Sequence, residues 1–60
     1  MGYKIMTCRF GIYSVKRFDT LEAAKKAFRS LYRYYVGEGD AEIWLMPDDD
    51  SGGFLDYERF

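Results

Sequence analysis

The sequence predicts an α+β fold, β-β-α-β-β, in which one helix packs on one face of a mostly antiparallel sheet. An amphipathic segment with apolar side chains three and four residues apart lies in the middle of the chain. Two segments rich in β-branched and aromatic residues precede it, and two follow it. Because the chain has 60 residues, we expect a single domain, 1–60. Such a domain buries only about 60% of the surface of its unfolded chain.

The first two strands are expected at residues 3–10 and 12–18, with a turn near Gly11. Tyr, Ile, Phe, Thr and Val are frequent in both segments, as is typical of strands. Apolar and polar residues are mixed on both sides of each strand, so the alternation alone gives a weak signal for the buried face. The side chains that we expect to point inward, toward the helix, are Met6, Cys8, Tyr13 and Val15.

The helix is expected to run from about Thr20 to Val36. Asp19 is predicted to be its N-cap, with Glu22 three residues later as the partner in a capping box. Gly37 follows as the residue that ends the helix. The apolar stripe comprises Leu21, Ala24, Phe28, Leu31 and Tyr35, of which Phe28 and Leu31 are expected to be buried.

The third strand is expected at residues 41–46, ended by Pro47, and the fourth at residues 54–60. Alternation in the third strand places Ala41, Ile43 and Leu45 toward the helix. The residues between them, Glu42, Trp44 and Met46, then point away from the helix. One helix covers one face of a four-stranded sheet, so Trp44 and Met46 mark a candidate contact surface on the other face.

Charge is divided unequally along the chain. Residues 1–37 contain eight basic and two acidic side chains, a net charge of +6. Residues 38–60 contain one basic and eight acidic side chains, a net charge of −7. The total of −1 hides this division, which bears on partners and electrostatic steering rather than on the fold.

Few residues of the chain are suited to catalysis or to metal binding. There is no histidine, the usual general base at neutral pH, and Cys8 is the one cysteine. The acidic turn at 48–53 resembles an EF-hand loop only in part, because Arg59 stands where that loop requires a glutamate. We therefore expect no enzyme activity and no cofactor, and metal binding by this turn stays an open question.

The expected location is the cytoplasm. No secretory signal is recognisable, and the longest apolar run, 43–46, is too short to cross a membrane, so we expect no membrane partner. In its size, its divided charge and its lack of catalytic motifs, the chain resembles the small inhibitors that phages make against host systems, including anti-CRISPR proteins. The resemblance implies a phage protein that binds a host protein. It carries over no functional residue, because no sequence signature is shared.

We predict a non-enzymatic protein-binding module or inhibitor whose acidic half occupies the basic surface of a host or phage protein. That surface could itself be a nucleic-acid-binding one, with the carboxylates acting as a DNA mimic. The predicted partner-binding residues are Asp48, Asp49, Asp50, Asp56, Glu58, Glu42 and Trp44.

Two alternatives stay open. The first is a nucleic-acid-binding domain that uses Lys26, Arg29, Arg33 and Tyr34. We rank it lower because the acidic half repels phosphate. The second is a self-associating domain that forms a homodimer through the open sheet face or an edge strand.

Overall fold

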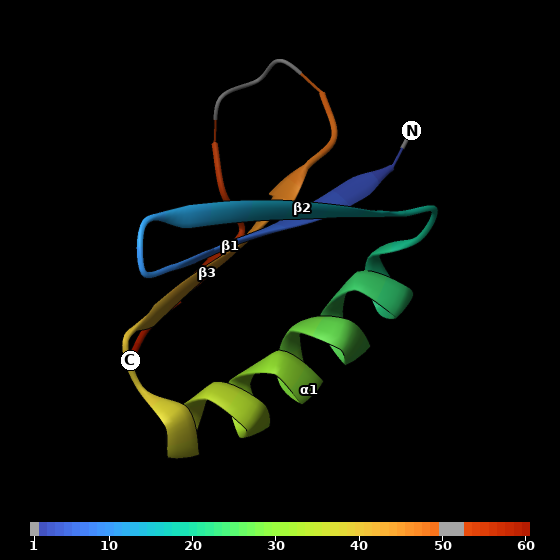
Figure 1. The fold of residues 1–60 in the computed structure, drawn as a ribbon. Helices are drawn as coiled ribbons and strands as arrows, with labels where there is room; N and C mark the ends of the chain where they lie inside the picture. The colour runs from blue at the N-terminus through green and yellow to red at the C-terminus, as the bar shows by residue number, and fades with distance from the viewer. Residues whose placement is uncertain (1, 50–52) are drawn as a thin grey trace.

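The computed structural model describes residues 2–49 and 53–60 and has the predicted α+β fold. The elements, in chain order, are β1 (Tyr3–Arg9), β2 (Ile12–Phe18), α1 (Leu21–Glu38), β3 (Ala41–Pro47) and β4 (Asp56–Arg59). The strands form one antiparallel sheet in the order β2-β1-β3-β4. The helix α1 runs along one side of this sheet, which leaves the other side without a covering element among the described residues (Figure 1).

A two-residue turn joins β1 to β2. Phe10 and Gly11 both have positive φ, 54° and 80°, as the type I′ turn of a tight hairpin requires. The turn sets Arg9 opposite Ile12 and thereby fixes the register of the whole hairpin. Phe10 is an unusual residue for this position, because a bulky side chain rarely adopts a left-handed conformation.

The expected inward direction of Met6, Cys8, Tyr13 and Val15 is wrong. Met6 lies opposite both Val15 and Trp44, and Cys8 lies opposite Tyr13. Directly opposite residues of antiparallel strands share a face, so all four belong to the face of Trp44, away from α1. Ile5 points to α1 instead: it pairs with Leu45 and is only 2% exposed. The buried stripe of β3 decides the facing of β1, whose own pattern is ambiguous.

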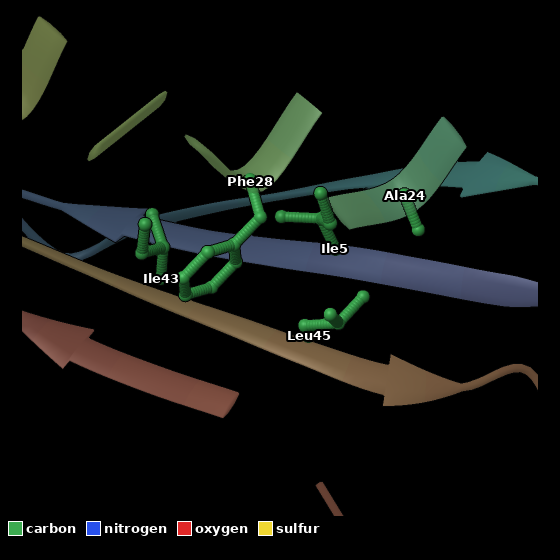
Figure 2. Close-up of a cluster of buried hydrophobic side chains, with 5 residues drawn as sticks. All are labelled: Ile5, Ala24, Phe28, Ile43 and Leu45. Atoms are coloured by element: carbon green, nitrogen blue, oxygen red, sulfur yellow. The ribbon is translucent and has the colours of Figure 1, made fainter. Parts of the chain in front are cut away.

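The core lies between α1 and the two central strands. Its buried side chains are Ile5, Ala24, Phe28, Ala41, Ile43 and Leu45, most of them drawn in Figure 2. The predicted inward direction of the three β3 residues is therefore confirmed, as is the burial of Phe28. Leu31, in contrast, is only half-buried, because it lines a groove between α1 and β2.

The limits of the elements differ slightly from the expected ones. Thr20, not Asp19, caps α1: its side-chain oxygen accepts a hydrogen bond from the backbone N–H of Ala23 at 3.2 Å. The helix continues through Gly37 and is ended by Gly39, which has a φ of 74°. At the sheet, β3 extends to Pro47, which lies opposite the first residue of β1, and β4 is confined to 56–59.

Thr20→Ala is expected to lower the free energy of unfolding by about 1 kcal/mol, because the N–H of Ala23 loses its acceptor. Asp19→Ala removes a side chain one position before the cap and should cost clearly less. Urea denaturation followed by circular dichroism measures both changes. A larger loss for Asp19→Ala than for Thr20→Ala would show that the helix begins one residue earlier.

Candidate functional site

The face of the sheet turned away from α1 is the most distinctive surface of the molecule, and we call it the open face. The pairing of the strands shows that every strand of the sheet contributes side chains to this face. Its residues are Lys4, Met6, Cys8, Tyr13, Val15, Arg17, Glu42, Trp44, Met46, Tyr57 and Arg59. The mixture of aromatic rings, methionines and charged groups is one that binding surfaces favour.

Three strands bring aromatic rings together on the open face. Trp44 lies between Tyr13, with ring centroids 6.5 Å apart, and Tyr57, with centroids 5.4 Å apart. Phe54, from the segment before β4, continues the line with its centroid 6.1 Å from that of Tyr57. We call these four residues the aromatic row. Trp44 is at its centre because β3 lies between the strands that carry the two tyrosines.

An open hollow of about 540 Å³ lies beside the aromatic row. Its lining residues are Lys4, Met6, Tyr13, Trp44, Met46, Pro47, Asp49, Gly53 and Phe54. Met6 and Met46 give this hollow polarizable, unbranched side chains that can adapt to different partner shapes. The hollow is therefore suited to receiving a side chain of another molecule.

The phenol groups of both tyrosines in the aromatic row have raised pKa values. The Tyr57 hydroxyl donates to a carboxylate oxygen of Glu42 at 3.0 Å, and this bond raises the pKa of Tyr57 above its ordinary value. The pKa of Tyr13 is also raised, mainly by a hydrogen bond with the side chain of Cys8. Both phenols are therefore neutral at physiological pH. The carboxylate of Glu42 places a negative charge beside the rings.

The predicted partner-binding residues are divided between the two sides of the sheet. Glu42 and Trp44 belong to the open face, and Asp49 lines the hollow beside them. Asp48 lies at the rim and forms an ion pair with Arg17, with 3.2 Å between the guanidinium Nε and the carboxylate. Four of the predicted residues are thus brought together at one surface.

The remaining acidic residues lie elsewhere. Asp56 and Glu58 line a groove of about 300 Å³ on the α1 side, together with Lys25 and Arg29. Opposite charges are mixed in that groove, so the acidic half of the sequence does not form one continuous acidic surface over the described residues. Asp50, also predicted to bind a partner, lies outside the described residues.

The residues of the nucleic-acid alternative lie on α1, on the other side of the sheet from the aromatic row. Lys26, Arg29, Arg33 and Tyr34 are all exposed. Tyr34 packs edge-to-face against Tyr35, with ring centroids 5.1 Å apart. The basic helix surface keeps the exposed ring of Tyr34 but lies on the opposite side of the sheet from the aromatic row.

The part of the chain that the structure describes contains no group of three or more potential metal ligands among His, Cys, Asp and Glu. No described helix is long and apolar enough to cross a membrane.

Three members of the aromatic row, Tyr13, Tyr57 and Phe54, were not predicted as site residues from the sequence. The tight turn gives a usable signal for one of them, because a two-residue loop at 10–11 pairs Tyr13 with Cys8 and so groups the outward side chains. Comparisons with protein-family models, with curated proteins and with solved structures gave no match.

Proposed function

We propose that this chain is a non-enzymatic protein-binding module whose open face binds a basic segment of a partner protein. The observation that carries the proposal is the position of Trp44 between two tyrosine rings, with the Glu42 carboxylate beside them. Aromatic faces attract cationic side chains, and tryptophan does so most strongly. A nearby carboxylate adds a charge-assisted hydrogen bond to a lysine or arginine.

The composition of the open face favours a protein partner over a nucleic acid. Its basic residues are Lys4, Arg17 and Arg59, and the acidic residues on it or at its rim are Glu42, Asp48 and Asp49. Affinity for nucleic acid depends on a net excess of positive charge on the protein surface that faces the phosphate backbone. On the open face the three basic and three acidic residues balance. Tryptophan, tyrosine and methionine are enriched in protein–protein interfaces, where they act as anchors.

Binding of a basic segment implies a mode of action for the module. By covering basic side chains of a host or phage protein that would otherwise contact phosphate, the module would inhibit that protein. The resemblance to small phage inhibitors supports this mode of action. We place the protein in the cytoplasm, where its single thiol stays reduced.

A labelled oligo-arginine peptide is the simplest probe of the proposed function. We expect its fluorescence anisotropy to rise with protein concentration, and the binding to weaken with added salt because exposed charges are screened. A labelled oligo-glutamate peptide and a labelled single-stranded oligonucleotide serve as controls, and neither is expected to bind. Tighter binding to the oligonucleotide than to the basic peptide would contradict the proposal.

Two double variants with the same change in charge show which surface binds. Glu42→Gln with Asp49→Asn removes two negative charges from the open face, and Asp56→Asn with Glu58→Gln removes two negative charges from the groove on the α1 side. We expect the first pair to weaken binding of the basic peptide about three- to tenfold, as exposed charge pairs do. The second pair should have a much smaller effect, and an equal effect would show that only the total charge matters.

A further inference from the structure

The two edges of the sheet differ in how well they are protected. The edge strand β4 has only four residues, and two of them are acidic. Short length is a device that prevents an edge from pairing with another chain, and both edges also carry charges, Lys16 and Arg17 in the case of β2. The other edge strand, β2, has seven residues, all but the last of them exposed, and includes Ile12 and Val15, which are 70% and 49% exposed. This long edge is the one that is open to pairing.

The hairpin turn determines which backbone groups of β2 point to the open edge. In a two-residue hairpin, the residues that flank the turn exchange both hydrogen bonds, so the bonded pairs contain Ile12 and every second residue after it. The side chain of Thr7 donates to the carbonyl oxygen of Ser14, which agrees with that carbonyl pointing to β1. The N–H and C=O groups of Tyr13, Val15 and Arg17 therefore point outward.

From this arrangement we propose that two copies of the chain pair through β2, antiparallel, about a twofold axis at Val15. Tyr13 of one copy then lies opposite Arg17 of the other, and Val15 lies opposite itself. All three outward-pointing residues of each strand find backbone partners in this register. The product is one continuous sheet made of two four-stranded halves.

Side-chain pairing in this register is self-complementary. On the α1 side, the exposed Ile12 lies opposite the half-buried Phe18 of the second copy, and Ser14 lies opposite Lys16. On the open face, Tyr13 lies opposite Arg17, a pair that allows a cation–π contact. No two like charges face each other across the axis. Aromatic–aliphatic pairs of this kind stabilise antiparallel strands.

Other registers are less favourable. A shift by two residues in one direction sets Lys16 opposite Lys16, which is destabilising. A shift by two in the other direction leaves Arg17 without a partner residue in β2. A shift by one residue would put the helices of the two copies on opposite sides of the joined sheet, because side chains alternate along a strand. The register centred on Val15 avoids all three costs.

This inference does not depend on the proposed function. Pairing through β2 leaves Trp44 and the hollow beside it uncovered, and it brings the open faces of both copies to the same side of the joined sheet. The dimer would therefore present two such faces to one partner. A monomer would leave the proposal for the open face intact, and a failure to bind basic peptides would leave the dimer intact.

Analytical ultracentrifugation of the full chain over a wide concentration range is the first test. We expect a reversible monomer–dimer equilibrium. Val15→Lys places like charges on the axis and is expected to raise the dimer dissociation constant at least about tenfold. Val36→Lys makes the same change at an exposed position of α1 and should leave the constant unchanged. A monomer at every concentration, or equal effects of both variants, would overturn the proposal.

Cysteine crosslinking tests the register itself. It uses a Cys8→Ser background, because Cys8 is the only native cysteine and its removal leaves the introduced cysteine as the only thiol. Residues opposite each other in a bonded pair have Cα atoms about 5.5 Å apart, within disulfide range. Val15→Cys is therefore expected to form a disulfide-linked dimer rapidly on mild oxidation. Ile12→Cys, exposed on the same strand, lies about 20 Å from its own copy across the axis and should not. Crosslinking of Ile12→Cys as fast as that of Val15→Cys would place the contact elsewhere and overturn the register.

Discussion

Replacing Phe28 with alanine is expected to remove a large part of the protein's free energy of unfolding. Phe28 is only 7% exposed and fills the space between α1 and the central strands, where it contacts the cluster drawn in Figure 2. Truncating a buried phenylalanine costs about 3–5 kcal/mol, since it removes buried apolar area and leaves a cavity. A chain of this length has a total stability of about 3–9 kcal/mol. The expected result is the largest fall in the urea midpoint of any single change described here, measured by circular dichroism.

Two further variants on the same helix control for the loss of a side chain in general. Val36→Ala, at a residue that is 61% exposed, should leave stability within about 0.5 kcal/mol of the wild type. Leu31→Ala, at a half-buried residue, should fall between the two. If Phe28→Ala unfolded at the same urea concentration as Val36→Ala, the packing of α1 on the sheet would be wrong.

The parts of the fold that the sequence predicts well are those with a strong periodic pattern. In β3, buried Ile43 and Leu45 alternate with outward Glu42 and Trp44, so a strand with one buried face was evident. The helix has a clear stripe at helical spacing, so its existence and its core-facing side were also evident. In the helix, one side of the pattern is apolar and the opposite side is charged. In β3 the inward side is aliphatic throughout, whereas the outward side combines Glu42 with Trp44 and Met46.

The facing of the hairpin is where sequence reasoning failed. Met6, Cys8, Tyr13 and Val15 were correctly grouped on one face, because the turn sets their register, but the face was assigned to the wrong side. Methionine and valine are as apolar as Ile5, so composition alone does not decide. The decision comes from β3, which lies next to β1 and buries Leu45 against Ile5. That contact joins segments forty residues apart and is not visible in a local pattern.

The candidate site could be predicted only in part for a related reason. The division of charge is a property of the sequence, but folding places Asp56 and Glu58 beside Lys25 and Arg29 and so mixes the two halves. Folding gathers the aromatic residues instead of dispersing them, because the pairing of β4 with β3 places Tyr57 beside Trp44. The side of β3 on which Trp44 lies was predictable from the sequence. Predicting which rings surround Trp44 would also have required the order of the strands in the sheet.

Replacing Trp44 with alanine is expected to weaken the binding of a basic peptide about thirtyfold, the largest effect of any single change on the open face. Trp44 is the central member of the aromatic row and contacts the rings of Tyr13 and Tyr57. Removing a central tryptophan from an interface commonly costs about 2 kcal/mol or more. The loss includes the face that attracts a cation and the support that positions both tyrosines. Anisotropy of the labelled oligo-arginine peptide measures it without relying on tryptophan fluorescence.

The matched control is Tyr34→Ala, which removes an exposed aromatic side chain from α1, on the other side of the sheet. We expect it to leave peptide affinity unchanged. Because Trp44 points away from the core, Trp44→Ala should keep a cooperative urea transition, and this shows whether lost binding reflects a lost site or a lost fold. Trp44→Phe should recover part of the affinity, since phenylalanine restores an aromatic face of lower cation affinity. Equal losses for Trp44→Ala and Tyr34→Ala would move the binding surface away from the open face, to α1 or to the total charge of the molecule.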